Sequence, residues 1–142
     1  MKKSVMEKMR EKGMKLTPQR RAILEFLVRK GTSHPGARVI HEHLRKKLKS
    51  LSLSTVYLTL KELERHGLIR ILEFDRRDNR CETNLDMHVN LICKRCHQIK
   101  DLPFLPLDPR EVLKKAGFQV SDTRVEYYGL CERCRRQGRY HV

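Results

Sequence analysis

The sequence of 142 residues contains no tryptophan and only four tyrosines and four phenylalanines. It has no run of about 18 apolar residues, so no segment is long enough to cross a bilayer as a helix. No segment joins a basic face to a broad apolar face rich in aromatic residues, which argues against a helix lying on a membrane. The start, MKKSVMEKMR, lacks the apolar stretch of a secretory signal. We therefore expect a protein of the reducing cytoplasm.

Acidic residues are also scarce, with 17 Asp and Glu against 32 Lys and Arg, for a net charge of +15. Residues 1–80 hold 21 basic and 9 acidic residues (+12), whereas residues 81–142 hold 11 and 8 (+3). This asymmetry predicts that the N-terminal half binds a polyanion, and the lack of membrane features favours double-stranded DNA. A basic surface that is merely solvated is the alternative.

Four of the five cysteines form two C-x-x-C pairs, a spacing that presents the four sulfurs of a tetrahedral Zn²⁺ site. These residues are Cys93, Cys96, Cys131 and Cys134. A redox motif would need only one pair, and a disulfide framework would need export. Cys93 to His97 also matches a haem-attachment motif, but that reading leaves the second pair unexplained. The fifth cysteine, Cys81, has no partner, and we interpret it as a half-buried strand residue.

Capping signals divide the basic half into helices. Thr17-Pro18 predicts a helix start, and Gly31 predicts the end of that helix. A second helix begins near Pro35. Ser52 predicts the start of a third, from residue 53 to residue 66, which Gly67 ends.

A hairpin follows these helices, with strands over residues 68–74 and 80–85 around a polar turn. Helices followed by a hairpin with a basic tip predict a winged helix-turn-helix domain over residues 1–84. Its third helix would enter the major groove, and the tip would reach phosphates or a minor groove. A small helical domain with no role for the hairpin is the alternative. The predicted DNA contacts are Lys15, Arg20, Ser54, Thr55, Tyr57, Lys61, Arg76 and Arg77.

Residues 85–142 predict a second, smaller α/β domain, which gives an α+β fold overall. Short strands over residues 89–93 and 98–102 flank the first C-x-x-C pair, a helix begins at Pro109, and a long strand runs over residues 118–130. A small sheet with an open edge, stapled by zinc, suits pairing with a second copy of the chain. The resulting homodimer would match two half-sites on DNA.

Five short motifs give the chain a resemblance to the ferric uptake regulator family, whose members are dimeric, metal-dependent bacterial repressors. They are Leu16-Thr17-Pro18-Gln19-Arg20, His34-Pro35, Ser54-Thr55-Val56-Tyr57, His88 with Cys93-x-x-Cys96, and Tyr128-Gly129-Leu130-Cys131. They occur in the family's order over nearly the whole chain.

The resemblance implies a second, regulatory metal site between the two domains. Its ligands by position are His34, Glu82, His88, Asn90 and Asp101. Imidazole and carboxylate ligands suit Fe²⁺, Mn²⁺ or Zn²⁺, whereas four thiolates suit a permanent zinc. The family usually has histidine where this chain has Asn90, and many members have arginine where it has Leu58.

The resemblance thus implies a repressor that senses Fe²⁺ or Mn²⁺, and not an enzyme. It also allows peroxide as the signal, through oxidation of His34 or His88 when Fe²⁺ occupies the site. A zinc-responsive member of the same family is one alternative. A zinc-stapled DNA-binding protein without metal sensing is another. A metal-dependent hydrolase is disfavoured because Glu82 is its only candidate base and no catalytic motif surrounds it.

Overall fold

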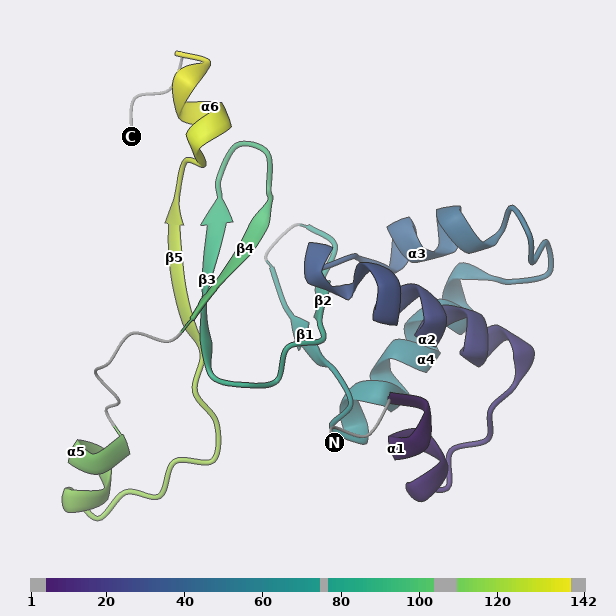
Figure 1. The fold of residues 1–142 in the computed structure, drawn as a ribbon, viewed down its shortest axis with the longest axis horizontal. Helices are drawn as coiled ribbons and strands as arrows, with labels where there is room; N and C mark the ends of the chain where they lie inside the picture. Colours follow the sequence, from purple (N-terminus) through teal and green to yellow (C-terminus); the bar gives the residue numbers. More distant parts are fainter. Residues whose placement is uncertain (1–4, 75–76, 104–109, 139–142) are drawn as a thin grey trace. The chain divides into compact units, whose positions relative to one another are not determined.

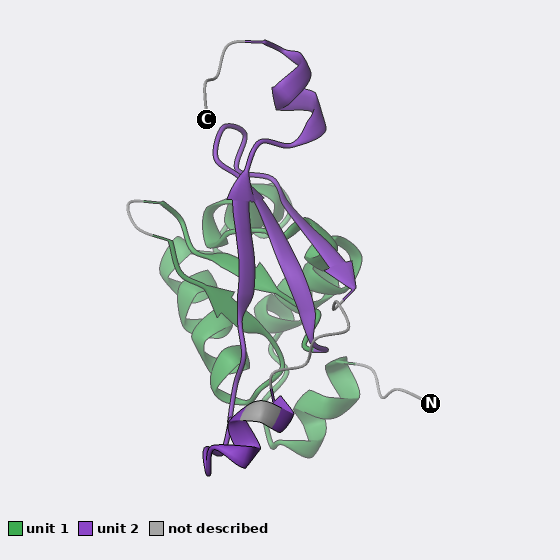
Figure 2. Ribbon diagram, turned by 90° about the vertical axis from the view of Figure 1, so that its left-hand side faces the viewer, with its two compact units in different colours: residues 1–85 green, residues 86–142 purple. Residues whose placement is uncertain are grey.

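The computed structural model describes residues 5–74, 77–103 and 110–138. The chain forms two compact units, residues 1–85 and residues 86–142 (Figure 2). No helix among the described residues is long and apolar enough to cross a membrane.

The described residues of the first unit, unit 1, form four helices, a short 3₁₀ helix and a hairpin (Figure 1). In order these are α1 (Val5–Glu11), α2 (Pro18–Lys30), η1 (Gly31–Ser33), α3 (Ala37–Leu44), α4 (Leu53–Arg65), β1 (Arg70–Leu72) and β2 (Arg80–Glu82). The two predicted caps are present. The side chain of Thr17 accepts a hydrogen bond from the N–H of Arg20 at 3.2 Å, and that of Ser52 accepts one from Thr55 at 3.1 Å.

The core of unit 1 lies between the helices and the hairpin. All four α-helices of unit 1 contribute fully buried side chains to it. These include Met9, Ile23, Leu24, Ile40 and Leu63. Burial of this face fixes the orientation of α4, because Val56, Leu60 and Leu63 point inward. The opposite face of α4 is left for solvent or a ligand.

The hairpin has the predicted antiparallel form, with Arg70 opposite Glu82 and Ile71 opposite Cys81. Cys81 is 2% exposed, so it is fully buried rather than half-buried. Helices followed by this hairpin confirm the winged-helix prediction for unit 1. Arg77 is exposed, and Arg76 lies outside the described residues.

Unit 2 contains a three-stranded sheet in the order β4-β3-β5. Its elements are β3 (His88–Cys93), β4 (Ile99–Pro103), α5 (Arg110–Lys115), β5 (Val125–Gly129) and α6 (Glu132–Arg136). β3 and β4 form an antiparallel hairpin, whereas β5 pairs with β3 in parallel. The strand predicted over residues 118–130 was wrong in extent, since residues 118–124 are outside any strand.

Candidate metal centre and nucleic-acid interface

The four predicted zinc ligands meet at one end of the sheet of unit 2. Cys93 ends β3, Cys131 is the N-cap of α6, and Cys134 lies within α6. One sulfur from each of these residues and from Cys96 lies within 4.8 Å of the others. The Cys96 and Cys131 sulfurs are 3.7 Å apart, close to the separation of about 3.8 Å that Zn–S bonds of about 2.3 Å give in a tetrahedron. The cluster fits a structural zinc ion.

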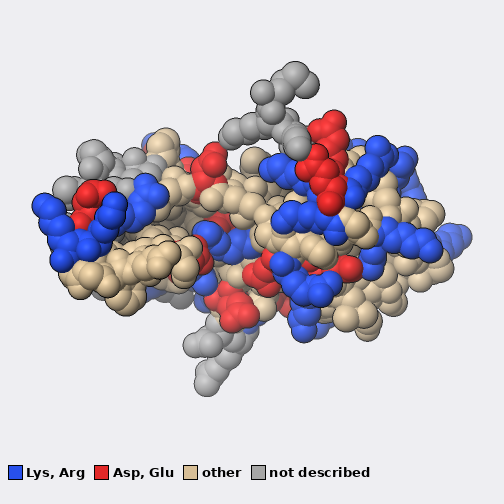
Figure 3. Space-filling view, turned by 90° about the horizontal axis from the view of Figure 1, so that it is seen from below, with Lys and Arg blue, Asp and Glu red and all other residues tan. Residues whose placement is uncertain are grey.

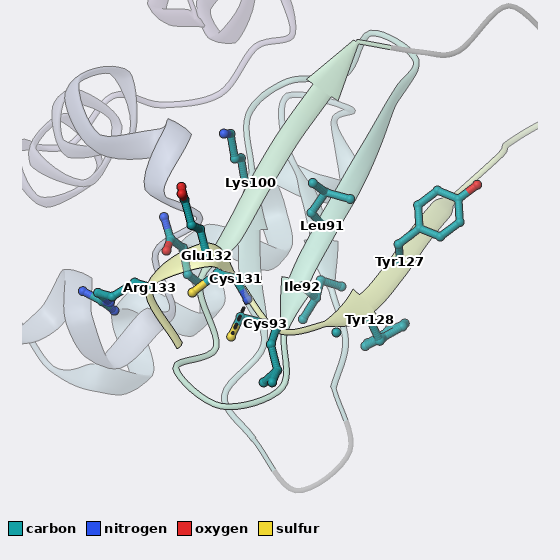
Figure 4. A pocket seen from close by; sticks show the side chains of 12 residues that line it. Leu91, Ile92, Cys93, Lys100, Tyr127, Tyr128, Cys131, Glu132 and Arg133 are labelled. Carbon is teal, nitrogen blue, oxygen red and sulfur yellow. Dashed lines mark hydrogen bonds between the residues drawn. The ribbon is translucent and has the colours of Figure 1, made fainter. Parts of the chain in front are cut away.

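The surroundings of this cluster shift the pKa values of two of its thiols in opposite directions. Burial acts to raise the pKa of Cys93, but hydrogen bonds from the backbone N–H groups of Cys131, Cys96 and Arg95 outweigh it and lower the pKa to about 5. The N–H of Cys131 is 3.4 Å from the Cys93 sulfur (dashed line in Figure 4). Burial, followed by hydrogen bonds to the other thiols, raises the pKa of Cys134 to about 12. A divalent cation bound at the cluster would favour the thiolate form of Cys134 as well, because metal ligands bind deprotonated.

A second candidate pair of ligands lies in unit 1. His34 and Glu82 are 1% and 0% exposed, and their Nε2 and Oε1 atoms are 3.6 Å apart. This separation is too long for a hydrogen bond. It is near the distance of about 3.4 Å that two ligands of one ion have when each bond is about 2.1 Å. A nitrogen and an oxygen so placed suit Fe²⁺, Mn²⁺ or Zn²⁺.

Backbone contacts hold His34 in place. Its φ of 51° is in the left-handed region, and its N–H donates to Gly31 at 3.0 Å. The Arg80 side chain donates to the carbonyl oxygens of His34 and Ser33. Since Arg80 is in β2, the strand that carries Glu82 also positions the histidine loop.

Arg70 was not predicted as part of this region. It lies opposite Glu82 in the hairpin, and its Nη1 atom is 3.6 Å from Glu82 Oε2. A buried carboxylate needs a compensating charge. Arg70 supplies one, and the cross-strand register could have indicated it once the hairpin was aligned.

Unit 2 carries its own pair of candidate ligands. The Nε2 atom of His88 is 3.7 Å from Asp101 Oδ1. The Nδ1 atom of His88 donates to the Asp86 carbonyl at 2.7 Å, which leaves Nε2 as the nitrogen able to bind a cation. Asn90, 3% exposed, is directly opposite Asp101 and two residues from His88, so all three share one face of the sheet.

The same face carries Glu126, which the sequence analysis missed. It is opposite Asn90 on β5, and its carboxylate accepts hydrogen bonds from Arg124 and from the Tyr128 hydroxyl. The parallel pairing of β5 brings it there. That pairing joins segments more than 30 residues apart and left no local signal in the sequence.

The predicted DNA-contacting residues of α4 lie on its outward face. Ser54, Tyr57 and Lys61 are exposed, and Thr55 is half-buried. Leu58 is 67% exposed on the same helix. Lys and Arg side chains are spread over the visible surface of unit 1 (Figure 3). Small hydroxyls, a tyrosine and a lysine on one helix face can reach base edges and phosphates in a major groove.

The predicted contacts at the start of α2 lie beside α4. Lys15 is exposed, and together with Thr17, Arg20, Thr55 and Leu58 it lines a hollow between the two helices. The guanidinium of Arg20 bonds to Glu62 of α4 at 2.5 Å and to the Lys15 carbonyl at 2.9 Å. The structure thus brings the start of α2 and the outward face of α4 into one surface.

A winged-helix unit joined to a sheet unit, with four clustered thiols and two buried imidazoles that each lie beside a carboxylate, defines a class of metal-binding DNA-binding proteins. The sequence model of the ferric uptake regulator family matches residues 11–128 of this chain. The peroxide operon regulator of Bacillus subtilis is 36% identical over 137 residues, covering 95% of this chain and 94% of that protein.

Solved structures agree with this match. A zinc-bound manganese uptake regulator superposes with a TM-score of 0.71 at 29% identity, over 91% of this chain and 99% of that one. The ferric uptake regulator of Helicobacter pylori, described as having three functional metal-binding sites, gives 0.77 at 26% identity, over 95% and 97%. The chain belongs to the ferric uptake regulator family, and it is a metal-dependent DNA-binding repressor. The family consists of dimeric transcriptional regulators.

Proposed function

We propose that one regulatory Fe²⁺ or Mn²⁺ ion is bound jointly by the two ligand pairs, His34 with Glu82 and His88 with Asp101. The observation that carries this proposal is that each unit presents one buried imidazole at 3.6–3.7 Å from one carboxylate oxygen. Two protein ligands are few for a tightly held transition-metal ion, whereas four together give a usual set. An ion that is bound by both ligand pairs would link the two units and thereby set the orientation of the winged-helix unit toward DNA.

Asn90 has a minor role in this scheme. An amide oxygen carries no charge and binds a cation more weakly than imidazole does. With one imidazole fewer, the site should favour Fe²⁺ and Mn²⁺ over Zn²⁺ more than a site with histidine at this position. Asn90 and the identity of the ion can therefore be tested together by an Asn90→His variant, which should bind Zn²⁺ more tightly.

We propose that α4 enters the major groove of operator DNA, with Ser54, Thr55, Tyr57 and Lys61 toward the bases and phosphates. Lys15 and Arg20 at the start of α2 belong to the same interface, and Arg76 and Arg77 of the wing reach the backbone beside it. The concentration of positive charge in residues 1–80 supports this assignment.

The exposed strands of unit 2 support dimerisation. Tyr127 and Tyr128 are 57% and 53% exposed, and with Lys100 and Leu91 they line an open hollow of about 520 Å³ (Figure 4). We propose that a second copy of the chain covers this surface in the cytoplasm, so that two winged units meet two half-sites.

The similarity to peroxide-responsive repressors supports peroxide as the signal. In this proposal His34, Glu82, His88 and Asp101 would hold the iron, the imidazole of His34 or His88 would gain one oxygen atom from peroxide, and water would be the other product. The altered ring no longer binds the cation, and DNA is released. Iron supplies the redox chemistry, and the chain's part is to place a histidine ring at the ion.

The deciding experiment titrates Mn²⁺ into zinc-loaded protein and measures Mn²⁺ affinity and DNA affinity separately. His34→Ala and His88→Ala should each weaken Mn²⁺ binding by about tenfold or more. Both should abolish the Mn²⁺-dependent gain in DNA affinity. His66→Ala, in a histidine outside both pairs, is the matched control and should change neither quantity.

Two outcomes would contradict the proposal. If Mn²⁺ fails to change DNA affinity in the wild type, the protein is a DNA-binding protein without metal sensing. If only one of the two histidine variants loses Mn²⁺, the ion does not bridge the two pairs. Peroxide sensing is tested by mass spectrometry of the iron-loaded protein after treatment with peroxide. If neither His34 nor His88 gains an oxygen atom, peroxide sensing is rejected.

A further inference from the structure

Arg20 is bonded entirely within the protein at its two terminal nitrogens. Its Nη2 atom donates to Glu62 Oε2 at 2.5 Å, and its Nη1 atom donates to the carbonyl oxygen of Lys15 at 2.9 Å. The side chains of Arg20 and Glu62 are each 26% exposed, so the pair is partly shielded from solvent. This guanidinium joins two segments that are 42 residues apart in sequence.

The planar fork of arginine suits this task. It offers several donors in fixed directions, so one side chain can hold a carboxylate and a carbonyl at the same time. Here the carboxylate belongs to α4 and the carbonyl belongs to Lys15, three residues before the start of α2, while the backbone N–H of Arg20 bonds to the Thr17 cap. The stretch that carries Lys15 is thereby fixed against α4.

The charge of the pair supports the same view. Glu62 places a carboxylate on α4, the helix whose outward face bears Tyr57 and Lys61. An unpaired carboxylate there would repel the phosphates of bound DNA. Arg20 is its nearer partner, at 2.5 Å against 4.0 Å for Arg65, and the Arg20–Glu62 pair contributes no net positive charge to the interface.

We propose that Arg20 is a positioning residue, which acts on DNA through Lys15 and α4 rather than by binding a phosphate itself. Glu62 is its necessary partner. The inference rests on the proposed DNA interface at α2 and α4. It adds that the specificity of that interface depends on an ion pair made inside the protein.

An Arg20→Lys variant gives the sharpest test because it conserves charge. Lysine binds phosphate well but cannot hold two acceptors in two directions. Affinity for a duplex selected by the wild-type protein should fall about fivefold, which corresponds to the typical net contribution of one hydrogen bond. Affinity for random-sequence duplex should stay unchanged. Arg21→Lys, at an exposed neighbour in the same helix, is the control and should match the wild type.

An Arg20→Met/Glu62→Met double variant removes the pair without changing the net charge. The salt dependence of DNA affinity should keep the wild-type slope, because Lys15 keeps its charge near the phosphates even when it is less well placed and Arg20 itself neutralises no phosphate. A slope smaller by about 0.9 would mean that Arg20 neutralises one phosphate, and it would overturn the proposal. Wild-type affinity in Arg20→Lys would overturn it as well. Melting temperatures of each variant separate a weakened interface from a failure to fold.

A Lys15→Ala/Tyr57→Ala variant distinguishes failure of this inference from failure of the interface itself. If that variant binds the selected duplex as the wild type does, α2 and α4 are not the DNA-binding surface. If it loses binding while Arg20→Lys does not, the interface stands and the positioning role of Arg20 is rejected.

Discussion

Replacing Gly31 by alanine is expected to destabilise unit 1, although alanine usually stabilises a helix relative to glycine. Gly31 follows α2 with φ at −59°, an ordinary helical value, so its backbone makes no demand for glycine. On backbone grounds alone the substitution should stabilise the fold by about 0.4–1 kcal/mol. The reason for glycine is a close approach from the hairpin.

A β-carbon at Gly31 would lie 2.5 Å from Cγ2 and 2.6 Å from Oγ1 of Thr83, the residue after β2. Because both branches of the threonine face the glycine, no rotation about its χ1 angle removes both contacts. Overpacking of this kind costs about 1–3 kcal/mol. After the backbone gain is subtracted, we expect a net loss of about 1–2 kcal/mol. For a unit of this size each kcal/mol lowers the melting temperature by roughly 4–8 °C.

The assay is thermal and urea denaturation of Gly31→Ala, Thr83→Ala and the double variant. In the double variant only the Thr83 β-carbon remains near, at 3.1 Å from the new methyl group, so most of the lost stability should return. Mn²⁺ affinity should follow stability, because Thr83 adjoins Glu82 and η1 leads into His34. A more stable Gly31→Ala protein, or a double variant no better than the single one, would refute the reasoning.

Three further predictions concern other parts of the fold. Ser52→Ala removes the cap of α4 and should cost about 1 kcal/mol in urea denaturation, whereas no loss would show that the cap is replaced. Removal of the cation at the four clustered cysteines with a chelator should abolish the protection of the unit 2 strand amides from hydrogen exchange, while the amides of the unit 1 helices stay protected. Equal loss of protection in both units would contradict this. Leu58, which is 67% exposed on α4, should contact a thymine methyl group of the DNA. Changing that thymine to uracil in a duplex selected by the protein should lower the affinity of the wild type about twofold to threefold, and should leave the affinity of Leu58→Ala unchanged.

The parts of the fold that depend on local chemistry were predictable from the sequence. Thr17 before Pro18 and Ser52 before an apolar stripe gave α2 and α4 with their caps, since a cap acts within three residues. The cysteine spacing indicated the four-thiol cluster for the same reason, because the members of each pair are three residues apart, across a turn for Cys93 and Cys96 and across the first turn of α6 for Cys131 and Cys134.

Contacts made across long stretches of sequence were not predictable. The bond from Arg20 to Glu62 and the approach of Gly31 to Thr83 each depend on how elements pack, which periodicity does not reveal. β5 was expected to begin at residue 118, because alternating residues there resemble a strand, but only Val125–Gly129 find a partner on β3. The ligand set of the regulatory site, His34, Glu82, His88, Asn90 and Asp101, came from the family resemblance and stays a prediction; four of these residues are buried, and Asp101 is not.

The parallel pairing of β5 with β3 has a consequence for assembly of the chain. No tight turn connects these strands, so no turn geometry fixes their register. A shift of the register by one residue would put Tyr127 on the face of the sheet that carries His88 and Asn90. Such a slip would also carry Cys131 and Cys134 about 3.3 Å away from the other two cysteines, well beyond what metal–sulfur bonds tolerate. Zinc binding at this cluster would thus depend on the correct register of β5 against β3, and only molecules with that register would retain the ion.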